Sequence, residues 1–152
     1  MKKLKCELKK NILKIQNNIM EVNKLILRKY MSLIGIGSAK IDLQLPKKSY
    51  CAGETVKGLF LIEGGTIEQQ LNRIDCDLFR IDKRSKSEQV IGSATVLTST
   101  VIAAEEKSER DFIFRLPENL PATTDTVFYQ FKTRLTFNEG VESSDQDVIN
   151  IK

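Results

Sequence analysis

Histidine is absent from this 152-residue sequence. Its absence removes the commonest general base, the usual Ser-His-Asp triad and most zinc sites. The three cysteines, Cys6, Cys51 and Cys76, form no CxxC pair and have no histidine that could activate them as nucleophiles. The sequence therefore predicts a protein that is not an enzyme, with no catalytic residue, no cofactor and no metal.

Long apolar runs are missing as well. No stretch approaches the roughly 20 apolar residues that a membrane-spanning helix requires, and Lys9, Lys10, Asn11 and Lys14 interrupt any signal-peptide core. An odd number of cysteines without a secretory signal indicates reduced thiols rather than a disulfide framework. These absences together predict a cytoplasmic protein.

Two short patterns carry weak chemical signals. Gly35-Ile36-Gly37 begins like a dinucleotide-binding loop, but Lys40 occupies the place of the last glycine and no βαβ pattern surrounds it, which favours a structural turn. Asp75 and Asp77 share one strand face, where a cation site is the alternative to a solvated face. Because no further ligands accompany them, we expect a solvated face.

Charge is concentrated at the N-terminus. Residues 1–31 contain nine Lys or Arg against two Glu, a net charge of +7, and the remaining residues contain 15 basic and 18 acidic side chains, a net charge of −3; together they give the total of +4. A basic segment on a mildly acidic body predicts two structural parts.

The first part has the hydrophobic period of a helix. Apolar residues recur every three or four positions and no Gly or Pro occurs before Gly35, which predicts a basic amphipathic helix over residues 1–34. The apolar stripe includes Leu4, Leu8, Ile12, Ile15, Ile19, Val22 and Ile26. The basic cluster beside it consists of Lys2, Lys3, Lys5, Lys9, Lys10 and Lys14.

This helix is a candidate interaction surface. A stripe sustained for about four heptads favours packing against a protein partner or against a second copy, which would give a homodimer through the helix. The lysines offer an alternative, weak contact with an anionic membrane surface, which would make the protein peripheral to the membrane. No nucleic-acid partner is expected, because the body lacks a positive surface with aromatic side chains and residues 83–86 have the pattern of a solvated hairpin tip.

After Gly35 the hydrophobic period changes from 3.6 to 2. Short alternating runs are separated by turn residues, with a polar loop at 82–88 and a charged turn at 105–111. The runs lie at residues 40–45, 56–62, 74–79, 90–104, 112–116, 127–137 and 147–151. This order, without intervening helices, predicts an all-β, immunoglobulin-like sandwich of two sheets over residues 35–152.

Two segments carry a family resemblance. Gly53-Glu54-Thr55-Val56-Lys57-Gly58 resembles the Gly-Glu-x-Val-x-Gly segment of arrestin-like N-terminal domains, and residues 112–123 resemble the F-x-F-x-L-P-x-x-L-P-x-[ST] segment of the same superfamily. Independently of the resemblance, Gly53 and Gly58 suit a tight turn and a close strand crossing, and Glu54 suits strand entry or a bond to the backbone. Pro117 and Pro121 are expected to rigidify a surface connection.

Further segments narrow the resemblance to the bacterial sporulation-control SpoOM family. They are residues 35–40, residues 64–69 and the D-x-D-x-I segment at 145–149. Membership would imply an arrestin-like regulatory adaptor that binds protein partners through sandwich edges and loops. Because family members continue into a second sandwich, the alternative is a structural remnant of a tandem protein that dimerises through its helix.

Overall fold

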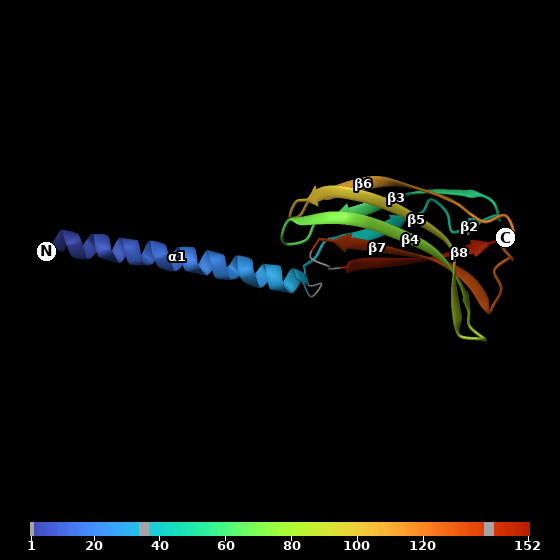
Figure 1. The fold of residues 1–152 in the computed structure, drawn as a ribbon, viewed down its shortest axis with the longest axis horizontal. Coiled ribbons are helices and arrows are strands. Elements are labelled where there is room, and N and C mark those ends of the chain that lie inside the picture. Colours follow the sequence, from blue (N-terminus) through green and yellow to red (C-terminus); the bar gives the residue numbers. More distant parts are fainter. Residues whose placement is uncertain (1, 34–36, 139–141) are drawn as a thin grey trace.

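The computed structural model describes residues 2–33, 37–138 and 142–152, and within the helix it describes the side chains of residues 8 and 10–28. The helix α1 (Lys2–Leu33) is one continuous element of 32 residues. It projects as a rod from one end of a β-sandwich (Figure 1). No helix among the described residues is long and apolar enough to cross a bilayer.

The described residues after the helix form eight strands in two sheets. One sheet has the order β1-β3-β6 and the other has the order β2-β8-β7-β4-β5. Neighbouring strands run antiparallel except for β2 and β8, which are parallel. The strands are β1 (Lys40–Gln44), β2 (Ser49–Tyr50), β3 (Thr55–Glu63), β4 (Gln69–Asp82), β5 (Ser87–Ile102), β6 (Lys107–Arg115), β7 (Val127–Phe137) and β8 (Glu142–Ile151). The predicted fold class, an all-β sandwich with an N-terminal helix, is confirmed.

The core lies between the sheets and is built from alternate residues of each strand. The burial pattern of β1 is exposed-buried-exposed-buried-exposed, and the predicted inward residues of β4, Ile74, Cys76 and Leu78, are at most 1% exposed. Phenylalanine rings join the layers, since Phe112 and Phe114 of β6 both meet Phe131 of β7 edge to face at 5.4 and 5.1 Å between centroids. The period-2 pattern therefore identified the buried faces.

Several strand bounds differ from the sequence predictions, including those of β4 and β5, which begin at Gln69 and Ser87 rather than at residues 74 and 90. β6 begins at Lys107, inside the predicted charged turn, and β8 begins at Glu142, before the predicted start at residue 147. The two-residue strand β2 was not predicted at all. Charged and hydroxyl side chains obscured the starts of β6 and β8, because backbone pairing with β3 and β7 extends these two strands beyond their apolar residues.

The prediction that Asp75 lies on a solvated strand face is wrong. Asp75 is 8% exposed, its Oδ2 lies 2.7 Å from Nε of Arg73, and its Oδ1 accepts a hydrogen bond from the Thr95 hydroxyl at 2.8 Å. An Arg134 nitrogen lies 3.8 Å from the same carboxylate. β4 is an interior strand between β5 and β7, so long side chains of its neighbours cover its outer face.

Candidate functional site

The two sheets are unequal in width, and this leaves two strand edges close together on one side of the sandwich. β5 ends the five-stranded sheet and β6 ends the three-stranded sheet. Residues of both strands line one groove, so the two edges face each other across it. An edge strand has main-chain N–H and C=O groups that no neighbour pairs, and these groups can bind another extended chain.

The β5 edge lacks the features that usually prevent such pairing. It is 16 residues long, and no charged residue or proline occurs from 89 to 102. The β6 edge is different, because five of its nine residues are charged. Charged side chains and short length are the usual protection of an edge strand. Of the two neighbouring edges, β5 is therefore the one open to an added strand.

The pairing of β5 with β4 is regular over a defined segment. It runs without interruption from Gly92, opposite Leu78, to Leu97, opposite Arg73. Register irregularities occur at both ends of this segment. Exposed apolar side chains accompany it, since Val96 is 38% and Leu97 is 78% exposed. Residues 92–97 thus form a regularly paired, uncharged edge of six residues.

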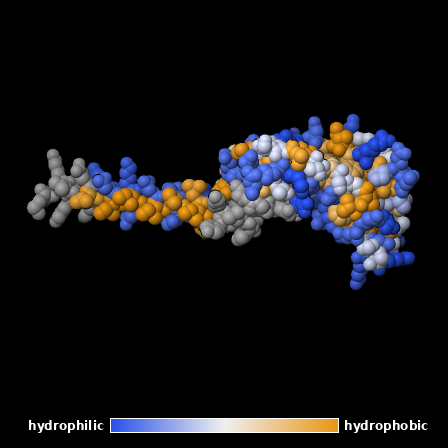
Figure 2. Space-filling model, in the orientation of Figure 1, coloured by the Kyte–Doolittle hydropathy of each residue, from blue (hydrophilic) through white to orange (hydrophobic). Residues whose placement is uncertain are grey.

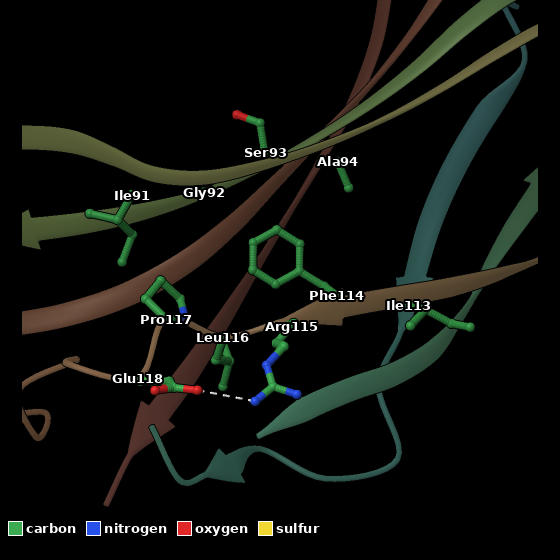
Figure 3. Close-up of a pocket in the computed structure, with 10 residues that line it drawn as sticks. All are labelled: Ile91, Gly92, Ser93, Ala94, Ile113, Phe114, Arg115, Leu116, Pro117 and Glu118. Carbon is green, nitrogen blue, oxygen red and sulfur yellow. Dashed lines mark hydrogen bonds and ion pairs between the residues drawn. The ribbon is translucent and has the colours of Figure 1, made fainter. Parts of the chain in front are cut away.

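A groove opens beside this segment between β5 and the end of β6. It holds about 460 Å³ and is lined by residues 91–94 and 113–118 (Figure 3). The ring of Phe114 lies against Gly92, where an added Cβ atom would come within 2.6 Å of the ring. Glycine at this position therefore leaves room for the aromatic ring beside the groove.

Hydrogen bonds mark both ends of the space between the strands. Toward the 103–106 turn, Nη2 of Arg110 donates to the Thr100 hydroxyl at 2.9 Å, which joins β6 to β5. At the other end, Nη2 of Arg115 donates to the Glu118 carboxylate at 3.2 Å (Figure 3). Since this exposed pair is neutral overall, the mouth of the groove has little preference for a charged ligand.

The two segments that carry the family resemblance lie next to each other beside this groove. β3 pairs with β6, so that Val56 lies opposite Phe114 and Gly58 opposite Phe112. Gly53 has a φ of +76°, and its N–H donates to the Pro117 carbonyl at 3.0 Å. The sequence identified both segments but could not show that they are in contact.

The remaining motif residues brace the same region. Oε2 of Glu54 accepts the Cys51 N–H at 2.8 Å, and Oε1 of Glu54 pairs with Lys47. An added Cβ at Gly58 would lie 2.5 Å from a backbone oxygen of β1. The carbonyl of Pro121 accepts a hydrogen bond from the Tyr129 hydroxyl at 2.7 Å. All of these contacts are structural, and none assembles a reactive group.

The helix presents its described side chains to solvent. Its apolar side chains form a stripe along one side of the rod (Figure 2). The exposed apolar members include Leu8, Ile12, Ile15, Ile19, Val22 and Ile26. Lys10 and Lys14 are exposed as well, whereas the side chains of Lys2, Lys3, Leu4, Lys5 and Lys9 lie outside the described residues, as do Gly35 and Ile36 of the expected turn.

A pair of carboxyl groups lies where β8 meets β1. Oδ2 of Asp145 accepts the Leu43 N–H at 2.9 Å and so links the two sheets. Oδ2 of the nearby Asp147 is buried and has no hydrogen-bond partner. The pKa of Asp147 is raised to about 7. Burial is the largest cause, and the negative charges of Asp145 and Asp42 add to it. Within the described part of the chain, no group of three or more acidic or cysteine side chains could hold a metal ion.

Comparison with known proteins decides the family. A family model described as "SpoOM protein" matches residues 27–152. The chain belongs to the SpoOM family. The resemblance seen in the motifs is thereby confirmed.

Relatives of this SpoOM chain include a protein of known structure. This chain is 32% identical over 131 residues to the sporulation-control protein spo0M of Bacillus subtilis (strain 168). The match covers 82% of this chain and 51% of the relative. The crystal structure of Spo0M from Bacillus subtilis matches with a TM-score of 0.69 over 77% of this chain and 50% of that one. This chain therefore spans about half the length of the relative that it matches.

A more distant structural match shows the fold alone. A Niemann-Pick type C2 protein from the Japanese carpenter ant is 8% identical, with a TM-score of 0.52 over 76% of this chain and 93% of that one. At this identity the match shows a shared sandwich fold and carries no functional argument.

Proposed function

We propose that this SpoOM-family chain is a regulatory adaptor in the control of sporulation, that it catalyses no reaction, and that it binds an extended segment of another protein at the β5 edge. The name of the Bacillus relative supports the biological context. The observation that carries the binding site is the uncharged edge of residues 92–97 beside an open groove. The arrestin-like resemblance supports the role of an adaptor.

The mode of binding follows from the chemistry of the edge. An added strand would exchange main-chain hydrogen bonds with β5, which supply affinity with little dependence on sequence. Alternate side chains of that strand would point toward the groove, and an apolar one would rest beside Phe114 and Ile91. Since β5 offers no charge between residues 89 and 102, charged side chains on the partner would lose hydration without gaining an ion pair. The preferred partner is therefore an uncharged segment rich in β-branched or aromatic residues.

The proposed site of action is the cytosol. Cys51 and Cys76 are both free thiols, which agrees with a reducing compartment. Burial raises the pKa of the Cys76 thiol to about 12, and the thiol accepts a hydrogen bond from the Thr133 hydroxyl at 3.4 Å. Cys76 is therefore an unreactive core side chain and not a candidate nucleophile.

A peptide-display selection on the full chain tests the proposal. We expect the selected peptides to be uncharged and to alternate apolar with polar residues. Val96→Lys should weaken their binding at least about tenfold, a change of about 1.4 kcal/mol. Val148→Lys is the matched control, since Val148 is 51% exposed on β8, which β7 and β4 separate from β5, and the change should leave binding within about twofold.

The selection can also refute the proposal. Charged or helical consensus peptides would contradict the uncharged-edge chemistry. Equal binding by the Val96→Lys and Val148→Lys variants would place the site away from β5. Circular dichroism and urea unfolding of both variants would establish that each retains the folded sandwich.

A further inference from the structure

We propose that three copies of this chain associate through α1 as a parallel three-stranded coiled coil. The proposal does not depend on the β5 site, because it uses only the helix. It differs from the homodimer expected from the sequence in the number of chains, and the reason lies in which residues occupy the apolar seam.

The apolar side chains of the helix follow a heptad register. From Leu8 the steps along the chain are four, three, four, three and four residues, which places them at alternating d and a positions. The seam consists of Leu8, Ile12, Ile15, Ile19, Val22 and Ile26. Their exposed fractions lie between 48% and 58%, so the described structure leaves the whole seam uncovered. Lys5 and Lys29 occupy the next positions of the register and limit it to these three heptads.

The residues beside the seam suit a second copy of the same chain. In this register the flanking e and g positions are held by Lys9, Asn11, Gln16, Asn18, Asn23 and Leu25, and only Lys9, at the N-terminal end of the seam, is charged. The charged residues among the described side chains, Lys10, Lys14, Glu21, Lys24 and Arg28, occupy the outer positions c and f. From Asn11 to Ile26, identical helices can therefore approach without bringing like charges face to face, which is the usual obstacle to self-association of a basic helix.

The same flank disfavours a lipid surface as the occupant. A second apolar row, Leu13, Met20 and Leu27, lies at the b positions. Gln16 and Asn23 lie between this row and the seam, near the middle of the apolar side of the helix. Insertion of that side into a bilayer would bury two amide groups without partners. In a coiled coil these amides lie at the margin of the seam, where water or a neighbouring helix satisfies them.

The identity of the seam residues selects three strands over two. Isoleucine occupies all three a positions, and two of the three d positions hold the β-branched residues Ile15 and Val22. Two-stranded parallel coiled coils favour leucine at d, whereas β-branched residues at both a and d favour higher numbers of strands. Symmetric assembly of three copies about a three-fold axis requires the helices to run parallel. Such a trimer would hold three sandwiches at one end of the rod and present three β5 edges together, which raises the avidity for a partner that repeats its binding segment.

Light scattering of the full chain over a concentration series tests the assembly. We expect a mass of about three times the 17.3 kDa of one chain at high concentration. Ile19→Lys should yield monomers whose sandwich is still folded by circular dichroism. Leu13→Lys, at an exposed position outside the seam, should remain trimeric. Replacing Ile15 and Val22 together by leucine should shift the mass toward a dimer.

Several results would overturn this inference. A wild-type monomer or dimer at all concentrations contradicts it, and so does dissociation by Leu13→Lys, which would indicate a broader bundle. Flotation of the wild-type chain, but not of the Ile19→Lys variant, with phosphatidylserine-containing vesicles would identify a membrane as the occupant. Failure here is distinguishable from failure at the β5 edge, because Val96→Lys leaves the helix intact and Ile19→Lys leaves each single binding edge intact.

Discussion

The carboxyl group of Asp147 should make the stability of the sandwich depend on pH in an unusual direction. Its Oδ2 is buried without a partner, and burial and the neighbouring Asp145 raise its pKa to about 7 in the folded chain. The ordinary value of about 3.9 applies when the chain is unfolded. Because the folded state resists ionisation, this group lowers stability as pH rises from about 4 to about 7, and the full penalty persists above pH 7.

The size of the effect follows from the shift. A difference of about three pKa units corresponds to about 4 kcal/mol if nothing screens the charge. Asp147 is partly exposed, and solvent screening reduces the penalty to about 1–2 kcal/mol. Asp147→Asn keeps the shape of the side chain and removes the charge. We therefore expect the variant to be about 1–2 kcal/mol more stable than the wild type at pH 8, with most of this advantage lost by pH 4.5.

Urea unfolding at a series of pH values measures this difference directly. Asp125→Asn, at an exposed carboxylate, is the control, and its stability relative to the wild type should change little over the same range. The reasoning is refuted if Asp147→Asn is less stable than the wild type at pH 8. It is refuted equally if the advantage of the variant is the same at pH 4.5 and pH 8.

Three further substitutions or reactions test individual parts of the fold. Gly58→Ala should destabilise the sandwich by about 1–3 kcal/mol in urea unfolding, because its Cβ would lie 2.5 Å from a backbone oxygen of β1; unchanged stability would mean that the strands separate without cost. Tyr129→Phe should cost about 1 kcal/mol by removing the 2.7 Å hydrogen bond to the Pro121 carbonyl, and no change in the urea midpoint would contradict a role for that bond. In the native protein a thiol reagent should modify the exposed Cys51 within minutes and the buried Cys76 only after unfolding. Mass spectrometry measures the modification of each thiol, and equal modification of both would show that the core opens readily.

The helix and the inward faces of the strands could be predicted from local patterns. The change of period after Gly35 separates the helical part from the strands, and alternation in residues 74–78 and 112–116 identifies side chains that the structure buries. These features are local, since each residue's face is fixed by its own position in the repeat. The motif at Gly53 likewise predicted a tight turn, and its φ of +76° shows why a glycine is there.

The candidate site could not be predicted in the same way, because it depends on how many strands each sheet contains. Nothing local to β5 indicates that its outer side lacks a neighbour. The absence of charge from residue 89 to 102 was available as a signal, but an uncharged run is equally typical of an interior strand. Asp75 illustrates the converse difficulty, since a carboxylate on an alternating strand suggests solvent, and only the position of β4 between two neighbours covers it.

Amide hydrogen exchange of the β5 edge tests the central claim most directly. In the free chain, the outward N–H groups of residues 92–97 have no partner in a neighbouring strand and should exchange rapidly, while those of β4 should exchange slowly. Addition of an uncharged, strand-forming peptide obtained by selection should slow exchange in residues 92–97 and leave the charged β6 edge unchanged. Protection that appears on β6 or on the loops, with residues 92–97 unaffected, would contradict the account.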